Sequence, residues 1–325
     1  MAETTSSAKL VTVFGGSGFV GRHVVQALAR RGYRVRVAVR RPDLAGHLQP
    51  LGDVGQVTAV QANLRYRWSV DRALEGTDAI VNAVGILYEA GRQGFDAVQA
   101  LGPRAIGEAA RAAGIGNLVH ISAIGADAGS DVAYLRSKGL GEAGVLETVP
   151  GAVILRPSVI FGPEDDFFNK FAGMAQLSPA LPLIGGGGTK FQPVYVGNVA
   201  EAVAVAIDGG ARPGTIYELG GPQIATFRQC LERMLAETGR KRVLVPMPFG
   251  VAKIMGKVMG LLPKPLLTAD QVRMLRSDTV VSQTAEAEGR TLAGLGIAAT
   301  AMDVILPTYL VRFREHGQFE RIRTT

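Results

Sequence analysis

Two residues in the middle of the chain have the types and the spacing for proton transfer. Tyr134 and Lys138 stand four positions apart, so a helix over this segment places them on one face. An ammonium group favours the ionised form of a nearby phenol, which then acts as a general acid or base closer to neutral pH. Ser122 lies upstream, at the end of a strand-like run. For the pair alone, a surface Tyr and Lys on an amphipathic helix is the alternative.

A glycine-rich segment near the start has the spacing of a phosphate-binding loop. Residues 15–21 form the sequence Gly-Gly-Ser-Gly-Phe-Val-Gly, between an apolar strand-like run and a helix pattern. Gly15 suits a tight turn, Gly18 lets the backbone approach a pyrophosphate, and Gly21 allows helix and strand to pack closely. The helix N-terminus then offers N–H groups and a positive dipole end. We expect dinucleotide contacts from Gly15, Ser17, Gly18, Phe19, Val20 and Gly21.

The end of the second strand-like run predicts which dinucleotide binds. An NAD site usually has an acidic residue about 20 positions after the glycine motif, where it holds the ribose 2′-OH. Arg40 and Arg41 stand at this place. A guanidinium pairs with a 2′-phosphate, so the sequence favours NADPH (NADP) over NAD. A solvated arginine pair is the alternative.

Strand-like and helix-like segments alternate from the start, which predicts an α/β fold with a Rossmann-type doubly wound parallel sheet. We expect an NAD(P)-binding domain over residues 8–165, with sheet segments returning around 190–225. Residues 166–325 then form a smaller C-terminal α/β lobe. Ligands of such sheets bind beyond the carboxyl ends of the strands. The residues expected to contact the dinucleotide there are Arg40, Arg41, Asn63, Leu64, Ala83, Val84, Gly85, Tyr134, Lys138 and Pro157.

The composition excludes several classes of function. The net charge of +7 is scattered, and no basic run interleaved with aromatic residues indicates nucleic-acid binding. The one cysteine, Cys230, excludes an intrachain disulfide and is expected to be a buried core thiol. His120, on an apolar strand, is expected in the core, and the four histidines lack metal-ligand spacing, so we expect no metal. We also expect no signal peptide and no transmembrane helix.

Taken together, these motifs resemble the extended short-chain dehydrogenase/reductase superfamily. The likeness covers about residues 10–225 and includes the glycine loop, Asn82-Ala83-Val84-Gly85, the Tyr134–Lys138 pair and residues 155–163, Leu-Arg-Pro-Ser-Val-Ile-Phe-Gly-Pro. The resemblance implies that Tyr134 exchanges a proton with a substrate oxygen. It also implies that Lys138 holds the ribose and lowers the pKa of Tyr134, and that Ser122 orients the substrate.

Two positions depart from the superfamily pattern. Gln99 replaces the Asn that supports the proton relay, and Asn63 replaces the Asp on the adenine side. Asn63 can still accept a hydrogen bond from the adenine amino group, so binding survives this change. The change at Gln99 weakens the prediction of catalysis.

A second set of motifs resembles one atypical branch, the nucleotide-binding accessory subunits of respiratory complex I. It includes residues 120–126, His-Ile-Ser-Ala-Ile-Gly-Ala, together with residues 161–169 and 217–222. The resemblance implies an accessory subunit of NADH:ubiquinone oxidoreductase that holds NADPH without turnover. Its partners would be the peripheral-arm and membrane-arm subunits, at the cytoplasmic side of a bacterial inner membrane. A catalytic NADPH-dependent reductase or nucleotide-sugar epimerase/dehydratase, and an NADPH-sensing regulator, remain as alternatives.

Residues 249–262 predict an apolar helix in the C-terminal lobe. Its expected apolar stripe consists of Val251, Ile254, Met255, Val258 and Leu261, and Lys253, Lys257 and Lys264 lie nearby. Such a helix could contact a membrane interface, a partner subunit or its own lobe. It is too short to span a bilayer, which takes about 20 residues.

Overall fold

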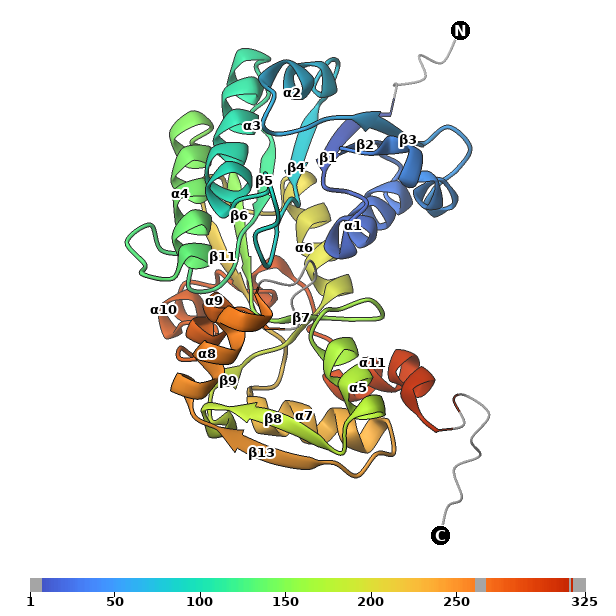
Figure 1. Ribbon diagram of the computed structural model, residues 1–325. Helices are drawn as coiled ribbons and strands as arrows, with labels where there is room; N and C mark the ends of the chain where they lie inside the picture. Colours follow the sequence, from blue (N-terminus) through green and yellow to red (C-terminus); the bar gives the residue numbers. More distant parts are fainter. Residues whose placement is uncertain (1–7, 261–266, 316, 318–325) are drawn as a thin grey trace, which may run out of the picture. The chain divides into compact units, whose positions relative to one another are not determined.

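A seven-stranded sheet with the order β11-β6-β5-β4-β1-β2-β3 forms the centre of the first of two compact units (Figure 1). The structure is a computed structural model and describes residues 8–260, 267–315 and 317. The first unit runs to Arg156 and adds Val199–Tyr217 and Gly294–Ile297. The strand order reverses between β1 and β4, which is where sheets of this type open a ligand crevice.

The sheet strands lie close to their predicted positions because most are short apolar runs; β1, β4 and β5 are buried along their whole length, whereas β3 at the edge of the sheet is largely exposed. They are β1 (Leu10–Phe14), β2 (Arg34–Val39), β3 (Val57–Gln61), β4 (Ala79–Asn82), β5 (Leu118–Ile121), β6 (Val153–Pro157) and β11 (Ile216–Leu219). The pairs β1–β2, β1–β4, β2–β3, β4–β5 and β5–β6 are all parallel. The predicted doubly wound parallel sheet is therefore confirmed.

Two groups of helices flank this sheet (Figure 1). The helices are α1 (Phe19–Arg30), α2 (Arg67–Ala73), α3 (Leu101–Ala112), α4 (Ala133–Thr148) and α6 (Val196–Ile207). On one side, α3 packs against both α2 and α4. On the other, Arg31 at the end of α1 pairs with Glu201 and Asp208, at and just after α6. One turn of π-helix, η3 (Asp96–Ala100), precedes α3, and such turns are frequent at functional sites.

The second unit comprises Pro157–Asn198, Glu218–Ala293 and the chain from Ala298 onward. Its strands are β7 (Ile160–Phe161), β8 (Ala180–Ile184), β9 (Lys190–Phe191), β10 (Val194–Tyr195), β12 (Ala225–Thr226) and β13 (Val243–Met247). Its helices are α5 (Phe168–Leu177), α7 (Phe227–Glu237), α8 (Phe249–Met259), α9 (Ala269–Met274), α10 (Gln283–Ala287) and α11 (Met302–Leu310). Edge-to-face phenylalanine pairs, such as Phe161 with Phe168, stabilise its core.

Cys230 lies fully buried on α7 in this core, as predicted, and burial raises the pKa of its thiol to about 12. The predicted helix over 249–262 corresponds to α8, although residues 261 and 262 lie outside the described part of the chain. Within the described residues, no helix is long and apolar enough to cross a membrane.

His120 occupies the centre of the first unit, as predicted for a core residue. It lies on β5 with no exposed surface, opposite Asn82 on β4. The Asn82 side-chain nitrogen and His120 Nδ1 are 3.0 Å apart, so the amide donates to a neutral imidazole. Desolvation, assisted by the nearby charge of Lys138, lowers the pKa of His120 to about 3.

Mild acid should therefore destabilise the first unit through His120. Below pH 6.5 the His120 imidazole binds a proton in the unfolded chain but stays neutral in the folded chain. The free energy of unfolding therefore falls as the pH falls from 6.5 towards 3. Between pH 7 and 5.5 the loss is about 1 kcal/mol. Chemical denaturation at both pH values measures it. His120→Asn, which retains an acceptor for Asn82, should remove this loss, whereas His47→Asn at an exposed position should not. Equal pH dependence in all three proteins would contradict the prediction.

Candidate functional site

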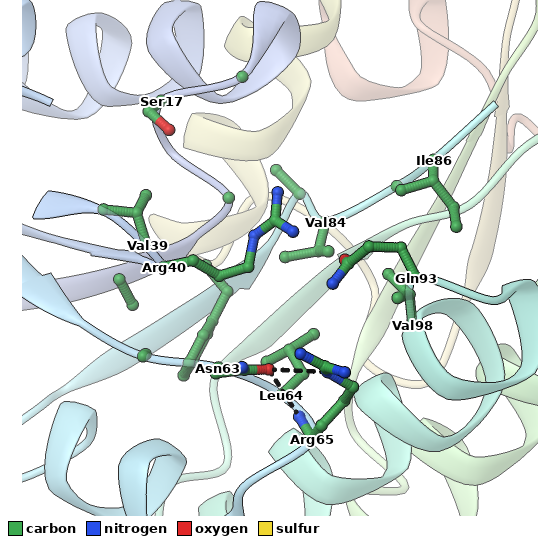
Figure 2. A pocket seen from close by; sticks show the side chains of 17 residues that line it. Ser17, Val39, Arg40, Asn63, Leu64, Arg65, Val84, Ile86, Gln93 and Val98 are labelled. Atoms are coloured by element: carbon green, nitrogen blue, oxygen red, sulfur yellow. Dashed lines mark hydrogen bonds between the residues drawn. The ribbon is translucent and has the colours of Figure 1, made fainter. Parts of the chain in front are cut away.

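A cavity of about 210 Å³ lies beyond the carboxyl ends of β1, β2, β3 and β4 (Figure 2). It is lined by Phe14, Gly15, Ser17, Gly18, Ala38, Val39, Arg40, Ala62, Asn63, Leu64, Arg65, Ala83, Val84, Gly85, Ile86, Gln93 and Val98. All of these residues belong to the first unit. The loops that follow β1, β2, β3 and β4 therefore converge on one cavity.

The glycine loop forms the wall of this cavity next to β1. Gly15 has a φ of +76°, which favours glycine, and its N–H donates to the Ala38 carbonyl oxygen at 3.1 Å. A Cβ on Gly21 would lie 2.2 Å from the Gly15 carbonyl oxygen, so only glycine allows α1 to start so close to the turn. Gly18, the exposed N-cap residue of α1, contributes no side chain. The loop and helix start therefore fit a bound pyrophosphate.

The two arginines after β2 have different surroundings. Arg40 lines the cavity, and Figure 2 shows Arg40 and Gln93 extending into it from opposite sides. Arg41 instead binds Asp43 with both ends of its guanidinium, at 2.9 and 2.6 Å. This carboxylate raises the pKa of Arg41, and the pKa of Asp43 is lowered in turn. Arg41 is therefore held in the loop, which leaves Arg40 as the guanidinium that faces a ligand.

The loop after β3 supplies a second guanidinium. Asn63 Oδ1 accepts hydrogen bonds from the backbone N–H of Arg65 at 3.2 Å and from its Nε at 3.4 Å (Figure 2). This turn holds Arg65 at the cavity wall. Arg40 and Arg65 are the charged groups among the described lining residues, and none of those residues is acidic. The cavity is therefore electropositive and fits an anionic ligand.

Gln99 connects the loop after β4 to the helix that carries Tyr134. Its Oε1 accepts a hydrogen bond from the Ile86 N–H, and its Nε2 donates to Ser137 Oγ, both at 3.1 Å. The Ser137 hydroxyl then donates to the Tyr134 carbonyl oxygen at 2.8 Å. Gln99 is 1% exposed, so both bonds form away from solvent. Its amide holds two backbone segments together.

Lys138 lies close to the cavity wall at Gly85. A Cβ on Gly85 would lie 3.5 Å from Lys138 Nζ and 3.6 Å from Gln99 Oε1. The Lys138 ammonium donates to the Ile121 carbonyl oxygen at 3.1 Å. Burial lowers the pKa of Lys138 to about 8, against the opposing effect of Glu142. Arg156 in turn forms a bidentate pair with Glu142, at 2.8 and 2.5 Å.

Tyr134 differs from the expectation of a lowered pKa. The phenol is almost fully buried, and its ring lies edge-on to Phe95 with ring centroids 5.8 Å apart. Burial raises the pKa of Tyr134 to about 12, because the low-dielectric surroundings disfavour the phenolate. The expectation of a lowered pKa for Tyr134 is therefore wrong, because desolvation has the larger effect on the phenol. Ser122 Oγ is also buried, and within the described residues it has no hydrogen-bond partner.

The predicted dinucleotide residues divide into two sets. Those that line the cavity are Gly15, Ser17, Gly18, Arg40, Asn63, Leu64, Ala83, Val84 and Gly85. The others, which are absent from its lining, are Phe19, Val20, Gly21, Arg41, Tyr134, Lys138 and Pro157. Phe19, Val20 and Gly21 instead form the first turn of α1, and Pro157 ends β6.

Sequence reasoning missed eight residues that line the cavity. They are Phe14, Ala38, Val39, Ala62, Arg65, Ile86, Gln93 and Val98. Most directly precede or follow a predicted strand-end residue, so extending each strand end by two positions would have found Arg65. No signal of this kind marks Gln93, which lies in a loop and forms a short bridge with Ala90. Within the described chain, no group of three or more His, Cys, Asp or Glu side chains could hold a metal ion.

Comparison with known proteins agrees with this geometry. Residues 11–220 match the NAD dependent epimerase/dehydratase family. A solved structure with the same fold is DesIV, a dTDP-glucose 4,6-dehydratase from Streptomyces venezuelae with NAD and TYD bound. Its TM-score is 0.70 at 20% sequence identity, and the match covers 94% of this chain and 96% of that one. This likeness concerns the fold.

Closer sequence similarity extends over both units. The chain is 36% identical to mitochondrial NADH dehydrogenase (ubiquinone) 1 alpha subcomplex subunit 9 of Arabidopsis thaliana, over 86% of this chain and 72% of that protein. It is 32% identical to the Mus musculus protein of the same name, over 95% and 82%. The chain therefore belongs to the NAD dependent epimerase/dehydratase family, and to the family of the alpha subcomplex subunit 9 proteins.

Proposed function

We propose that this chain is an accessory subunit of NADH:ubiquinone oxidoreductase, respiratory complex I, and that it holds NADPH without turning it over. The observation that carries the proposal is the similarity to the alpha subcomplex subunit 9 proteins, which spans 86–95% of the chain. The similarity includes the second unit, which has no part in the cavity lining. The sequence similarity to these complex I subunits therefore extends well beyond the residues that line the cavity.

The family carries a nicotinamide dinucleotide, and we propose NADPH on the basis of charge. Gly15, Ser17 and Gly18 would hold the pyrophosphate at the start of α1. Arg40 would bind the 2′-phosphate, since Arg41 is committed to Asp43. NAD offers no 2′-phosphate, so it would leave the Arg40 guanidinium without a partner.

Retention without turnover is supported by the surroundings of Gln99 and Tyr134. Both polar ends of the Gln99 amide are engaged in bonds to Ile86 and Ser137, so the amide is a connector between segments. The raised pKa of Tyr134 disfavours the phenolate that a proton relay would pass through. When bound, NADPH supplies a hydride donor, whereas these residues supply packing and orientation.

We further propose that the chain attaches to the peripheral-arm and membrane-arm subunits at the cytoplasmic side of a bacterial inner membrane, in part through contact with the membrane interface. Attachment from outside the bilayer is compatible with the described helices, none of which could cross it.

A catalytic NADPH-dependent reductase or nucleotide-sugar epimerase/dehydratase is the second candidate. One observation favours it. The buried Ser122 hydroxyl has no hydrogen-bond partner within the described residues, so it could donate a hydrogen bond to a substrate oxygen. In that case Tyr134 would exchange the proton and Lys138 would hold the ribose.

Isolation from native membranes tests the proposal directly. The chain should co-purify with complex I, and extraction should release NADPH in an amount close to that of the chain. Tyr134→Phe should keep both the nucleotide and the assembly, because Tyr134 is absent from the lining of the cavity and the change removes only the hydroxyl. A chain that never co-sediments with complex I would contradict the accessory function. Loss of turnover of a carbonyl substrate in Tyr134→Phe would instead establish the enzyme.

Arg40 and Arg41 form a matched pair for testing cofactor choice. Arg40→Ala should weaken NADPH binding by about ten- to a hundredfold, the effect of losing a charged hydrogen bond, and should leave NADH binding nearly unchanged. Arg41→Ala removes the same charge from a guanidinium that Asp43 already holds, so its effect should be small. Calorimetric titration with both nucleotides measures the difference. Equal losses in the two variants would argue against the 2′-phosphate contact.

Two glycines separate binding from folding. A Cβ at Gly18 would meet only the Gly15 carbonyl oxygen at 3.3 Å, so Gly18→Ala should fold but bind NADPH weakly. Gly21→Ala places a Cβ at 2.2 Å from the same oxygen and should lower the melting temperature even without nucleotide. Thermal unfolding with and without NADPH distinguishes the two. A Gly21→Ala protein as stable as the native chain would refute the packing argument.

A further inference from the structure

Helix α8 exposes large apolar side chains and buries small residues, unlike an ordinary surface helix. Its buried residues are the small ones, Ala252 and Gly256. Its large apolar residues Val251, Ile254 and Val258 are 55, 67 and 65% exposed. A helix that folds onto its own domain normally buries the large apolar side chains and exposes polar ones. The outer face of α8 therefore fits an apolar environment that the described part of the chain does not supply.

The small residues face inward because α9 lies directly against them (Figure 1). A Cβ on Gly256 would lie 2.9 Å from the backbone at Thr268 and Ala269, so a side chain here would push the helices apart. Val251, Ile254 and Val258 follow one another by three and four positions, which places them in one stripe. The orientation of α8 is thus fixed by close packing on one side, with the stripe outward on the other.

The charge around α8 identifies the occupant of this face. Residues 240–268 contain six lysines and arginines and no aspartate or glutamate. Two of them, Lys253 and Lys257, lie on α8, and Lys257 is exposed. The next carboxylate along the chain, Asp270, pairs with Arg273 at 3.4 Å. An apolar stripe on a helix whose own charged residues are all lysines is complementary to a lipid surface with anionic headgroups.

A second element of this segment also exposes large apolar side chains. On β13, Val243 and Val245 are 66 and 45% exposed. By contrast, Val304 is the exposed large hydrophobic residue of α11, and Asp303 precedes it. Clustered apolar exposure marks an interaction site, whereas an isolated exposed valine is ordinary.

We propose that α8 lies in the plane of a membrane interface, with Val251, Ile254 and Val258 among the upper acyl chains and its lysines among anionic phospholipid headgroups. At eleven residues, and about 16 Å, the helix suits an in-plane position. This proposal specifies the membrane contact named in the proposed function. It depends on the proposed function only for the identity of the membrane that is bound. The lipid contact itself needs neither nucleotide nor a partner subunit.

Sedimentation with lipid vesicles tests the apolar stripe. The purified full chain should bind vesicles of phosphatidylcholine with phosphatidylglycerol, and bind vesicles of phosphatidylcholine alone much more weakly. The double change Ile254→Asp and Val258→Asp should lower binding by at least about tenfold, since each removes apolar burial and adds like charge to the headgroups. Val304→Asp is the matched control and should bind as the native chain does. An equal loss in the control would overturn the proposal.

The lysines give an independent measurement that leaves the apolar stripe intact. Each lysine near an anionic surface contributes about 1 kcal/mol, so Lys253→Gln with Lys257→Gln should weaken binding to the anionic vesicles by about thirtyfold. Binding to neutral vesicles should not change, and added salt should reduce the native chain's affinity towards that of the variant.

Two outcomes would overturn the inference without touching the proposed function. The native chain could fail to bind anionic vesicles at all. Alternatively, the Ile254→Asp and Val258→Asp protein could bind vesicles normally but no longer co-purify with complex I, which would identify the stripe as a protein contact. Failure of the proposed function has a different signature, because then even the native chain lacks NADPH or complex I while its vesicle binding is unaffected.

Discussion

The first unit depends on one backbone contact, the approach of α1 to the turn that follows β1. The Gly15 carbonyl oxygen occupies the space in which a Cβ of residue 21 would stand. Because the helix begins directly against this turn, its first N–H groups lie at the edge where the parallel strands end. A wider separation would move α1 away from the sheet and remove one wall of the cavity. Anion binding by this unit is therefore a consequence of packing as much as of charge.

The charge of the cavity is set by which carboxylates are kept out of it. Asp43 stands only three positions after Arg40, yet its partner is Arg41, on the loop outside the cavity lining. The buried Glu142 carboxylate is similarly paired with Arg156. Two carboxylates close to the site in sequence or in space are thus neutralised by arginines, and the field over the lining residues remains positive. The exposed Arg41–Asp43 pair affects the charge of the cavity more than it affects stability, since exposed pairs contribute little to stability.

Much of the fold could be predicted from the sequence, because buried parallel strands are apolar runs and the glycine loop has a fixed geometry. The limits of β1 and the roles of Gly15 and Gly21 follow from local residue type alone. The sequence does not predict that Arg40 lines the cavity while Arg41 pairs with Asp43, since this difference depends on a turn that directs two adjacent side chains apart. The raised pKa of Tyr134 could not be predicted from the sequence either, because desolvation depends on the residues that pack around the phenol in the folded chain. Gln99 was recognised as a departure, but its two bonding partners lie 13 and 38 positions away.

The π-helical turn η3 has a consequence for how this chain can change through evolution. Val98 on this turn lines the cavity, while its neighbour Gln99 reaches Ser137 on α4. A π-turn contains one residue more than the α-turn that would replace it, and each helical residue turns the following chain by about 100°. Deleting a single residue here would rotate α3 relative to the sheet and separate the two tasks of Val98 and Gln99. Insertions and deletions should thus be rarer in residues 96–100 than in the loops on either side, although side chains within the turn can still be exchanged.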